Sequence, residues 1–304
     1  MTGARAALVR SVQARLARHA RAAGRLYEDV LVRHALERFL FRLGEGPWSR
    51  SFILKGGLLV QALGGERARS TRDIDLLGTT TLTLEGLQEV VGVSAGLEVP
   101  DDGWQFDAGA CRVSPLRAGT KYPGLRANLP ATLGRSRVRV RIDVGSGDAL
   151  VPPATELSYP TLLDQAPPRL YAYSPSTIVA EKLEAMIALG TINSRVKDYF
   201  DIALLARTQP FNGQTLVEAI RACCARRGTQ LPTALPAGLS RDFEEAPAAR
   251  DLWRAFSAKL RQSPALMTWR ATVGACREFV EEPLGHAEAH APFAKQWPRG
   301  GPWC

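Results

Sequence analysis

Two aspartates separated by one isoleucine, Asp73 and Asp75, stand in an apolar run and constrain how this chain can fold. Alternate residues of a β-strand point to the same face, so the two carboxylates would share one side of a sheet. Carboxylates held that close repel each other and titrate as a coupled pair, and a divalent cation relieves the repulsion. The pattern predicts a strand with a metal-dependent site. For the Asp-x-Asp pattern alone, a solvated strand end is the open alternative.

A third carboxylate belongs to a second predicted strand, because residues 135–144 alternate strictly between apolar and charged side chains. The apolar face would carry Val138, Val140 and Ile142, and the polar face Arg137, Arg139, Arg141 and Asp143. In phosphoryl and nucleotidyl transfer, metal ions held by several carboxylates bridge the attacking and leaving oxygens. We therefore take Asp73, Asp75 and Asp143 as candidate metal ligands.

A glycine-rich element precedes the acidic pair. Lys55, Gly56 and Gly57 follow the apolar residues 52–54 and are predicted to open a helix. Unpaired backbone N–H groups and the helix dipole make such a helix start attractive to phosphate. Two glycines alone also mark many tight turns. Their position shortly before the Asp-x-Asp pattern favours a phosphate site.

Two charged clusters follow in predicted helices. Lys182 would lie on an apolar helix face, where a lysine is costly unless it meets an anion. A nucleotide phosphate is one candidate anion. The alternative, which this helix alone favours, is that the lysine extends to water or pairs with a carboxylate. Further on, Arg195, Asp198 and Asp201 recur at three-residue steps. They form either an ion-pair ladder or a face that presents Asp198 to the metal or, as a base, to an incoming hydroxyl.

The order of elements predicts an α/β protein with N-terminal helices, a mixed sheet and a helical C-terminal half. The core with its N-terminal helices would span residues 1–150, a helical region 151–282 and a flexible tail 283–304. Helices are predicted at 4–43 (divided at Gly24), 55–63, 83–95, 177–189, 195–207, 214–228, 238–261 and 264–282, strands at 73–77, around 98–117 and at 135–144, and a loop at 150–175.

The composition of the 304-residue chain, 45% hydrophobic and 23% charged, is that of a globular protein, and its net charge is +9. This charge favours a polyanionic partner such as RNA, although an arginine-rich proteome would produce it too. The sequence has no apolar run long enough to cross a membrane. Five cysteines without metal-ligand spacing favour a reducing, cytoplasmic compartment.

Taken together, these segments resemble the nucleotidyltransferase AbiEii/AbiGii toxin family, which includes the MenT-type toxins. The resemblance covers roughly residues 30 to 210 and rests on the joint order of five motifs. They are Leu36-Glu37-Arg38-Phe39-Leu40, Phe52-Ile53-Leu54-Lys55-Gly56-Gly57, Thr71-Arg72-Asp73-Ile74-Asp75-Leu76, Ala180-Glu181-Lys182-Leu183-Glu184 and Arg195-Val196-Lys197-Asp198-Tyr199-Phe200-Asp201.

The resemblance implies a nucleotidyltransferase fold with Mg²⁺ (or Mn²⁺) as cofactor and an NTP as co-substrate. Asp73 and Asp75 match metal-binding carboxylates, Asp143 fits the third acidic position, and Thr71 matches the motif's hydroxyl residue, with Ser70 where many relatives have Gly. Lys182 matches the lysine that holds nucleotide phosphates and Asp198 the later catalytic acid. Asp73, Lys182 and Asp198 are thus the expected catalytic residues, and Lys55, Gly56, Gly57, Thr71 and Lys182 the expected nucleotide-binding residues.

The implied function is that of a toxin from a toxin–antitoxin pair, which transfers a nucleotide from an NTP to RNA. The acceptor end of tRNA is the favoured acceptor, and a cognate antitoxin the expected partner. Two alternatives stay open at this point. The enzyme could modify a protein or a small molecule, or a basic RNA-binding protein could keep the fold without catalysis.

Overall fold

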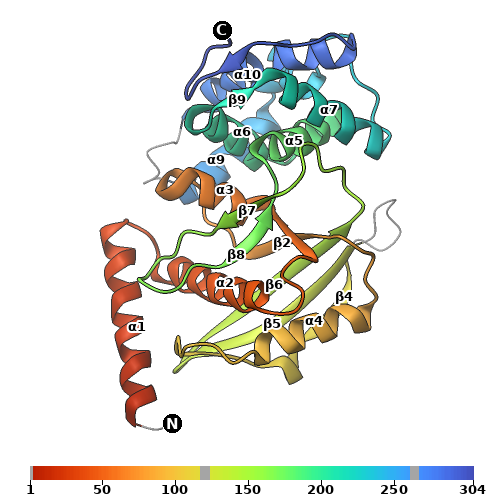
Figure 1. Cartoon of the computed structure of the whole chain (residues 1–304). Helices are drawn as coiled ribbons and strands as arrows, with labels where there is room; N and C mark the ends of the chain where they lie inside the picture. Colours follow the sequence, from red (N-terminus) through yellow and green to blue (C-terminus); the bar gives the residue numbers. More distant parts are fainter. Residues whose placement is uncertain (1–2, 117–123, 261–266) are drawn as a thin grey trace. The chain divides into compact units, whose positions relative to one another are not determined.

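A computed structural model describes residues 3–116, 124–260 and 267–304, and its chain divides into two compact units (Figure 1). The sheet unit comprises residues 1–62, 70–147 and 155–172, and the helical unit residues 63–69, 148–154 and 173–304. The chain therefore passes between the units several times. The boundary predicted at residue 150 is displaced, because the 155–172 segment adds two strands to the sheet.

The sheet unit contains three long helices and a mixed eight-stranded sheet of order β3-β5-β6-β2-β1-β8-β7, with β4 paired to β5. Its helices are α1 (Gly3–Ala22), α2 (Tyr27–Glu45) and α4 (Leu84–Gly96), and its strands are β1 (Phe52–Lys55), β2 (Asp73–Gly78), β3 (Trp104–Phe106), β4 (Arg112–Leu116), β5 (Gly124–Leu133), β6 (Ser136–Ser146), β7 (Thr155–Ser158) and β8 (Arg169–Ala172). A short 3-10 turn, η2 (Ala108–Ala110), precedes β4. Helix α3 (Gly56–Gly64) follows β1 directly, and η1 (Gly65–Arg67) follows α3.

The alternation predicted for the two acidic strands is present. Ile74, Val140 and Ile142 are buried, whereas Asp73, Asp75 and Asp143 are only partly buried. Helices α2 and α4 pack against the sheet (Figure 1). The predicted break between the first two helices occurs at Gly24, which adopts a φ of 60°.

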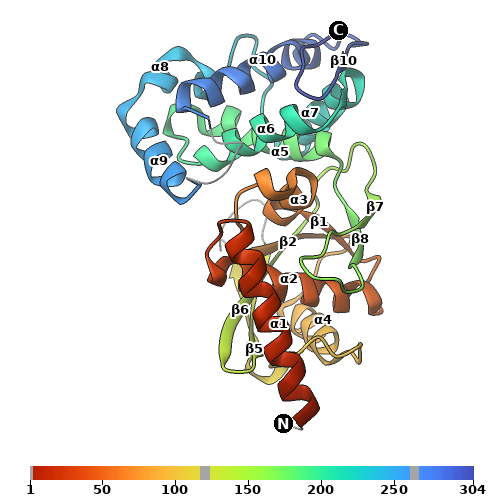
Figure 2. The same cartoon turned by 90° about the vertical axis from the view of Figure 1, so that its left-hand side faces the viewer.

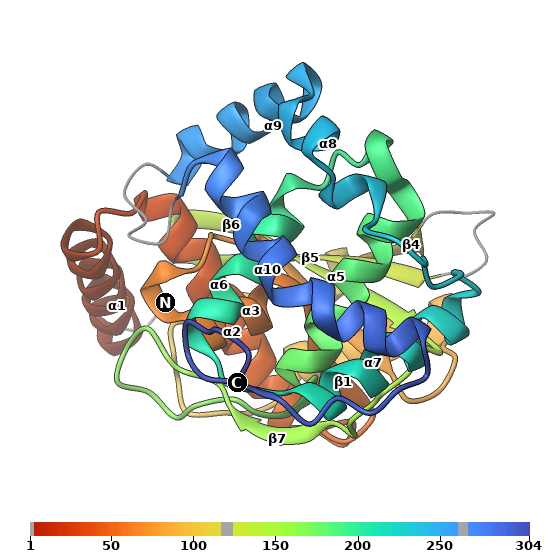
Figure 3. The same cartoon turned by 90° about the horizontal axis from the view of Figure 1, so that it is seen from above.

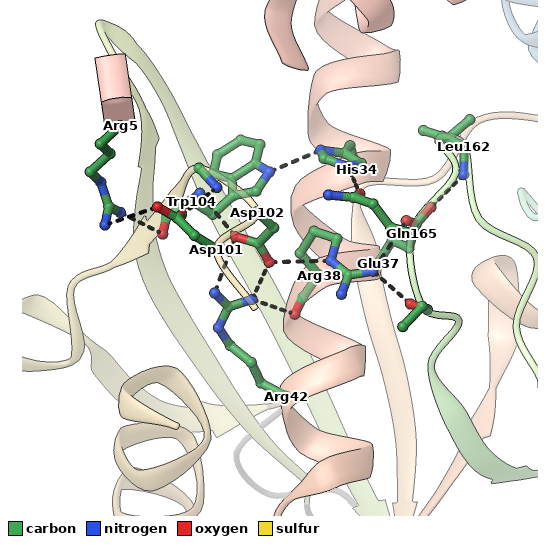
Figure 4. A network of polar contacts seen from close by, with 12 residues as sticks. Arg5, His34, Glu37, Arg38, Arg42, Asp101, Asp102, Trp104, Leu162 and Gln165 are labelled. Atoms are coloured by element: carbon green, nitrogen blue, oxygen red, sulfur yellow. Dashed lines mark hydrogen bonds and ion pairs between the residues drawn. The ribbon is translucent and has the colours of Figure 1, made fainter. Parts of the chain in front are cut away.

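Buried polar residues of α2 anchor two loops of the sheet unit (Figure 4). The indole N–H of Trp104 donates to His34 Nδ1 at 2.9 Å, so the other ring nitrogen carries the proton and donates to Gln165 Oε1 at 2.8 Å. Burial lowers the pKa of His34 to about 4, which keeps the ring neutral. One neutral imidazole therefore ties the segments around residues 104 and 165 to the same helix.

Beside it, Asp102 accepts hydrogen bonds from Arg38 at 3.2 Å and from Arg42 at 2.6 and 3.2 Å (Figure 4). Burial acts to raise the pKa of Asp102, but the hydrogen bonds and charge of Arg42 outweigh it and lower the pKa. Arg38 belongs to the first of the five sequence motifs. Its neighbour Glu37 accepts the backbone N–H of Leu162 at 2.8 Å. This motif therefore has a structural role, because it connects α2 to the segments around residues 102 and 162.

The helical unit is built mainly of helices (Figures 2 and 3). Two aromatic clusters pack within it, one around Tyr199 and one around Phe279. Its elements are α5 (Pro175–Leu189), η3 (Gly190–Ile192), α6 (Val196–Thr208), β9 (Phe211–Asn212), α7 (Gly213–Arg227), η4 (Ala237–Leu239), α8 (Arg241–Glu245), α9 (Pro247–Ser257), η5 (Ala258–Leu260), α10 (Trp269–Glu288) and β10 (Gln296–Trp297). Figure 3 shows α10 crossing α6 and α7, with which it makes contact. The first cluster joins Tyr199, Phe243 and Trp269, whose ring centroids lie 5.1 to 5.9 Å apart.

Local signals explain where these helices begin and end. Ser174 caps α5 by accepting the N–H of Thr177, and Pro175 occupies its first turn. Asn212 caps α7 in the same way, and Gly228 ends it in the left-handed conformation. The predicted helix 238–261 is instead divided into short helices, because Pro247 begins α9. The predicted helix 264–282 corresponds to α10, although residues 261 and 264–266 lie outside the described part of the chain.

Three further expectations need correction. Strand β5 was not predicted, and the predicted loop 150–175 contains β7 and β8. The tail 283–304 is packed, because α10 continues through Pro283 and the last residues contact the helical unit. Trp297 donates to the carbonyl of Ala206 at 2.7 Å, and the Trp303 ring stacks on Phe279 at 5.7 Å. Large aromatic surfaces thus stabilise a segment that lacks periodicity.

No helix within the described residues is long and apolar enough to cross a membrane.

Candidate active site

The sheet brings the three predicted carboxylates to one face. Strands β2 and β6 are parallel, and Asp75 lies opposite Asp143. Strand β1 runs antiparallel to β2 on its other side, and Lys55 lies opposite Asp75. Residues directly opposite each other point to the same face, so Lys55, Asp75 and Asp143 form one row across the sheet. Asp73 lies in the next row, opposite Arg141.

The glycine pair is shaped around the carboxylate of Asp75. Gly56 has a φ of 65°, and a Cβ atom added there would overlap the Asp75 carboxylate. The backbone N–H of Gly57 points to Asp75 Oδ2 at 3.4 Å. A non-glycine residue at position 56 would therefore be strained and would also displace Asp75. Lys55 itself ends β1, so the helix begins one residue later than predicted.

Asp75 is electrostatically unfavourable in its ionised form. Burial raises its pKa, and the nearby Asp143 and, more weakly, Asp73 raise it further, whereas the Gly57 N–H and Lys55 lower it only in part. A nearby positive charge would therefore stabilise the ionised form of this carboxylate. This is the electrostatic property expected of a cation ligand.

Two arginines neutralise the neighbouring carboxylates. Arg126 of β5 donates to both oxygens of Asp143 at 2.6 Å, and Arg141 of β6 donates to Asp73 at 2.9 Å. The hydrogen bond and charge of Asp143 raise the pKa of Arg126 above its ordinary value. Sequence reasoning missed Arg126. The available signal was the alternation of Ala127, Leu129 and Ala131 with polar or proline residues, which the small alanines made inconspicuous.

Thr71 lies in the extended segment just before β2 and is partly buried. Its hydroxyl has no hydrogen-bond partner among the described residues. The preceding Ser70 accepts a hydrogen bond from Arg25 at 3.3 Å. Of the two hydroxyl residues, Ser70 is thus hydrogen-bonded to a side chain, whereas Thr71 lies immediately before the acidic strand β2.

The second cluster belongs to the helical unit and is deeply buried. Lys182 of α5, 7% exposed, donates to Asp198 at 2.7 Å and to Asp201 at 2.8 Å. Arg69 donates to both oxygens of Asp201 at 2.9 Å, and Arg195 donates to Asp198 at 2.6 Å. The arrangement is the ion-pair ladder considered from the sequence. In this structure the anions that Lys182 meets are carboxylates.

Charge pairing decides the ionisation of this cluster. Burial acts to raise the pKa of Asp198, but Lys182 and Arg195 hold it at about 2. Burial likewise opposes ionisation of Asp201, yet Arg69 and Lys182 lower its pKa. The two aspartates in turn raise the pKa of Lys182 despite its burial. All three groups are therefore charged at neutral pH, and Asp198 as paired here is a weak base.

The carboxylate donors of the sheet unit fit a divalent cation in kind and in register. Hard cations such as Mg²⁺ prefer oxygen ligands, and Mg²⁺ is usually held by one or two carboxylates together with substrate phosphates. Among residues 3–116, 124–260 and 267–304, no group of three or more acidic, histidine or cysteine side chains is gathered as a metal site. Asp75 shares its strand face with Asp73, two residues before it, and lies directly opposite Asp143, so each of these carboxylates is a candidate to share a cation with Asp75.

A small cavity lies at the ends of β2 and β6. Its volume is about 70 Å³, and it is lined by Thr80, Thr81, Leu82, Gly124, Leu125, Val144, Gly145 and Ser146. Pockets for small organic ligands typically measure about 300–1,000 Å³, so this cavity is too small for a nucleotide. This cavity is therefore not a candidate nucleotide site.

The match to a family model agrees with the resemblance seen in the motifs. A family model described as nucleotidyl transferase AbiEii toxin, type IV toxin–antitoxin system, matches residues 38–275. The structure of JHP933 from Helicobacter pylori is 14% identical, with a TM-score of 0.46 over 86% of this chain and 92% of that one. A candidate nucleotidyltransferase from H. pylori is 13% identical, with a TM-score of 0.46 over 86% and 95% of the two chains. No match was found among curated proteins.

Proposed function

Because this chain belongs to the nucleotidyl transferase AbiEii toxin family of type IV toxin–antitoxin systems, we propose that it transfers a nucleotide from an NTP to RNA. The acceptor end of tRNA is the first acceptor to test. An RNA hydroxyl oxygen would attack the α-phosphorus of the NTP, the bond to the β-phosphate oxygen would break, and pyrophosphate would leave. The hydroxyl proton would pass to solvent or to a carboxylate of the site.

The observation that supports this proposal best is the environment of Asp75. Gly56 and Gly57 fit its carboxylate, while Asp143 and Asp73 disfavour its charge. A fold gains nothing in stability from a carboxylate placed in this way. Natural proteins retain such unfavourable groups mainly at functional sites.

A divalent cation, Mg²⁺ or Mn²⁺, would be held by Asp73 and Asp75, with Asp143 as a further ligand. When bound, it would supply Lewis-acid polarisation of the phosphoryl oxygens. Lys55 adds positive charge in the same row of the sheet, and the amides at the start of α3 are a second place for phosphate oxygens. Thr71 would contact a phosphate from the segment before β2.

For the helical unit, we propose that Lys182 is a phosphate-binding lysine and that Asp198 keeps it ionised and in place. The hydrogen bonds of Lys182 to Asp198 and Asp201 support the positioning part of this role. The pKa of about 2 for Asp198 favours this role over that of a general base. A cognate antitoxin is the proposed partner of the toxin in the cell.

Incubation with total tRNA and each α-labelled NTP in turn tests the function. The wild-type chain should label RNA with one or a few of the nucleotides, and Asp73→Ala should abolish labelling while far-UV circular dichroism stays unchanged. Labelling retained by Asp73→Ala would contradict the assignment of Asp73.

The same reaction with total protein or aminoglycosides in place of RNA tests the other acceptor classes. Labelling of either one, but not of RNA, would replace the proposed acceptor. The exposed arginines of β6 argue against a cationic drug, because like charges repel.

A further inference from the structure

A row of arginines leads along β6 toward the acidic site. Arg137 and Arg139 are exposed and Arg141 is partly buried, and all three occupy alternate positions of the strand. Alternate residues of a strand point to the same face and lie about 7 Å apart. Together they place three arginines in succession along the polar face of β6.

The neighbouring strand β5 places no negative charge opposite these arginines. On β5, the residues opposite Arg137, Arg139 and Arg141 are Thr132, Pro130 and Asn128, none of which is charged. Within the described part of the chain, no carboxylate forms an ion pair with Arg137 or Arg139. An exposed arginine needs no partner for stability, but two aligned ones form a positive strip that attracts a polyanion.

The end of the strip coincides with the carboxylates. Arg141, the third arginine, donates to Asp73 at 2.9 Å, and the next alternate residue, Asp143, lies opposite Asp75. The charge along this strand face therefore changes from positive to negative at the candidate metal ligands. A polyanion bound along the strip would therefore have its end near Asp73 and Asp75.

We propose that the outer face of β6 binds the sugar–phosphate backbone of an extended single-stranded RNA end, with Arg137 and Arg139 on successive phosphates. The inference rests on the proposed function and names the form of its acceptor. The step between the arginines is of the same order as the separation of successive phosphates in an extended strand. The terminal hydroxyl would then lie near Asp73. Contacts of this kind read charge and not base identity, so the strip selects for a free single-stranded end of any sequence.

Binding of a 5′-fluorescein-labelled single-stranded RNA to the full chain, measured by anisotropy without NTP, tests the surface. Arg137→Gln/Arg139→Gln should raise the Kd several-fold and lower the slope of log K against log salt by about 1.4, since each single-strand phosphate contact contributes about 0.7. The matched control is Arg241→Gln/Arg250→Gln, which removes the same charge from exposed positions of the helical unit. If both double variants lost RNA affinity equally, net charge alone would explain the loss, and the proposal would be overturned.

Neutral backbone linkages locate the contacts. A methylphosphonate placed at one linkage near the 3′ end should weaken binding to the wild-type chain. At the linkages that Arg137 and Arg139 contact, it should cause no additional loss in the double variant. The proposed binding of single-stranded RNA along the strip would be overturned by either of two results. One is that the losses caused by the methylphosphonate and by the double variant add at every linkage, and the other is that a blunt duplex of the same length binds with equal affinity.

The two proposals fail separately. If the wild-type chain labels RNA but Arg137→Gln/Arg139→Gln has an unchanged KM for RNA, the proposed binding along the strip is wrong and the proposed nucleotidyl transfer is supported. If the RNA binds through the two arginines but no nucleotide is ever transferred, the binding along the strip is supported and the proposed function is wrong. If both stand, the double variant should raise the KM for RNA several-fold and leave the KM for NTP unchanged.

Discussion

The two charged clusters of this protein solve opposite electrostatic problems. In the sheet unit, Asp75 has two carboxylate neighbours, one long hydrogen bond and a raised pKa. In the helical unit, Asp201 is fully buried, yet Arg69 and Lys182 give it three short hydrogen bonds and a lowered pKa. Asp75 is the more exposed of the two aspartates, yet its ionised form is the less favourable one, so the sign of the neighbouring charges and not the degree of burial distinguishes the clusters. The charge of Asp75 is not compensated by its neighbours, whereas the charge of Asp201 is compensated by Arg69 and Lys182.

This contrast suggests a division of labour. A cluster that is satisfied without a ligand maintains geometry, and a cluster that is unsatisfied changes most when a ligand binds. Substitutions should consequently separate activity from stability. Changes in the carboxylate row should affect catalysis with little cost in folding, whereas changes in the Lys182 cluster should affect folding first.

The largest expected effect is that of Asp75→Asn on catalysis. The amide keeps the shape and can still accept the Gly57 N–H, but it loses the charge that holds a cation. Transfer should fall at least about a thousand-fold, which corresponds to about 4 kcal/mol of transition-state stabilisation. The free energy of unfolding in urea should stay equal or rise, because the variant removes an unfavourable buried charge. A marked loss of stability in Asp75→Asn would show that the carboxylate is structural and would break the comparison.

The opposite pattern is expected for Lys182→Met. Removing the lysine leaves Asp198 with Arg195 alone and Asp201 with Arg69 alone, so two buried carboxylates lose part of their compensation. Breaking a buried ion pair in this way typically costs about 3–5 kcal/mol. Urea unfolding followed by tryptophan fluorescence measures the change.

The control is Lys197→Met, which removes an exposed lysine from α6 close to the same cluster. Its unfolding free energy should change by no more than about 0.5 kcal/mol. If both variants had the same stability, the buried ion pairs would contribute nothing, and Lys182 would be free to act only on a ligand.

Sequence reasoning found the carboxylates of both clusters and Lys182, but it missed Arg69 and Arg126, which pair with two of those carboxylates. The period-two patterns of β2 and β6 placed Asp73, Asp75 and Asp143 on strand faces. The helical spacing of Arg195, Asp198 and Asp201 allowed an ion-pair ladder as one of two interpretations. These features are local. The parallel pairing that sets Asp75 opposite Asp143 depends on a crossover that no local pattern specifies.

The elements that sequence reasoning missed have physical reasons in common. Strand β5 alternates small alanines with a proline, so its hydrophobic signal is weak, and with it Arg126 was overlooked. Strands β7 and β8 are four residues each and adjoin prolines. The C-terminal segment is stabilised by Trp297 and Trp303, whose partners are distant in sequence. In each case tertiary contacts, and not local propensity, determine the structure.

A third buried carboxylate, Glu37, sharpens the comparison through pH. It is 1% exposed, and burial raises its pKa to about 7, although the Leu162 N–H and Arg38 act in the other direction. The folded state thus holds a proton that the unfolded state has lost above its ordinary pKa of 4.5. Stability should fall as pH rises from about 4.5 to 7, by up to about 3 kcal/mol from this residue.

Glu37→Gln should therefore flatten the dependence of unfolding free energy on pH between pH 4.5 and 7.5. Chemical denaturation at several pH values, with wild type and the variant side by side, measures the slope. A slope that is the same in both would mean that Glu37 stays ionised in the fold, and partner charge would then outweigh burial in this network as well.

A small effect on folding, and the most specific test of the carboxylate row, is expected from Arg126→Gln. The pair of Arg126 with Asp143 is about one-third exposed on the arginine side, so its loss should cost at most about 1 kcal/mol. Its removal leaves Asp143 beside Asp75 without a neutralising charge, and a divalent cation is the obvious replacement. The affinity for Mn²⁺, measured by electron paramagnetic resonance without NTP, should therefore rise several-fold. Asp75→Asn in the same assay should lower it, because that variant removes a ligand. If Arg126→Gln lowered the Mn²⁺ affinity instead, the arginine would be organising the carboxylates for the cation and not substituting for it, and the row would resemble the satisfied cluster around Lys182.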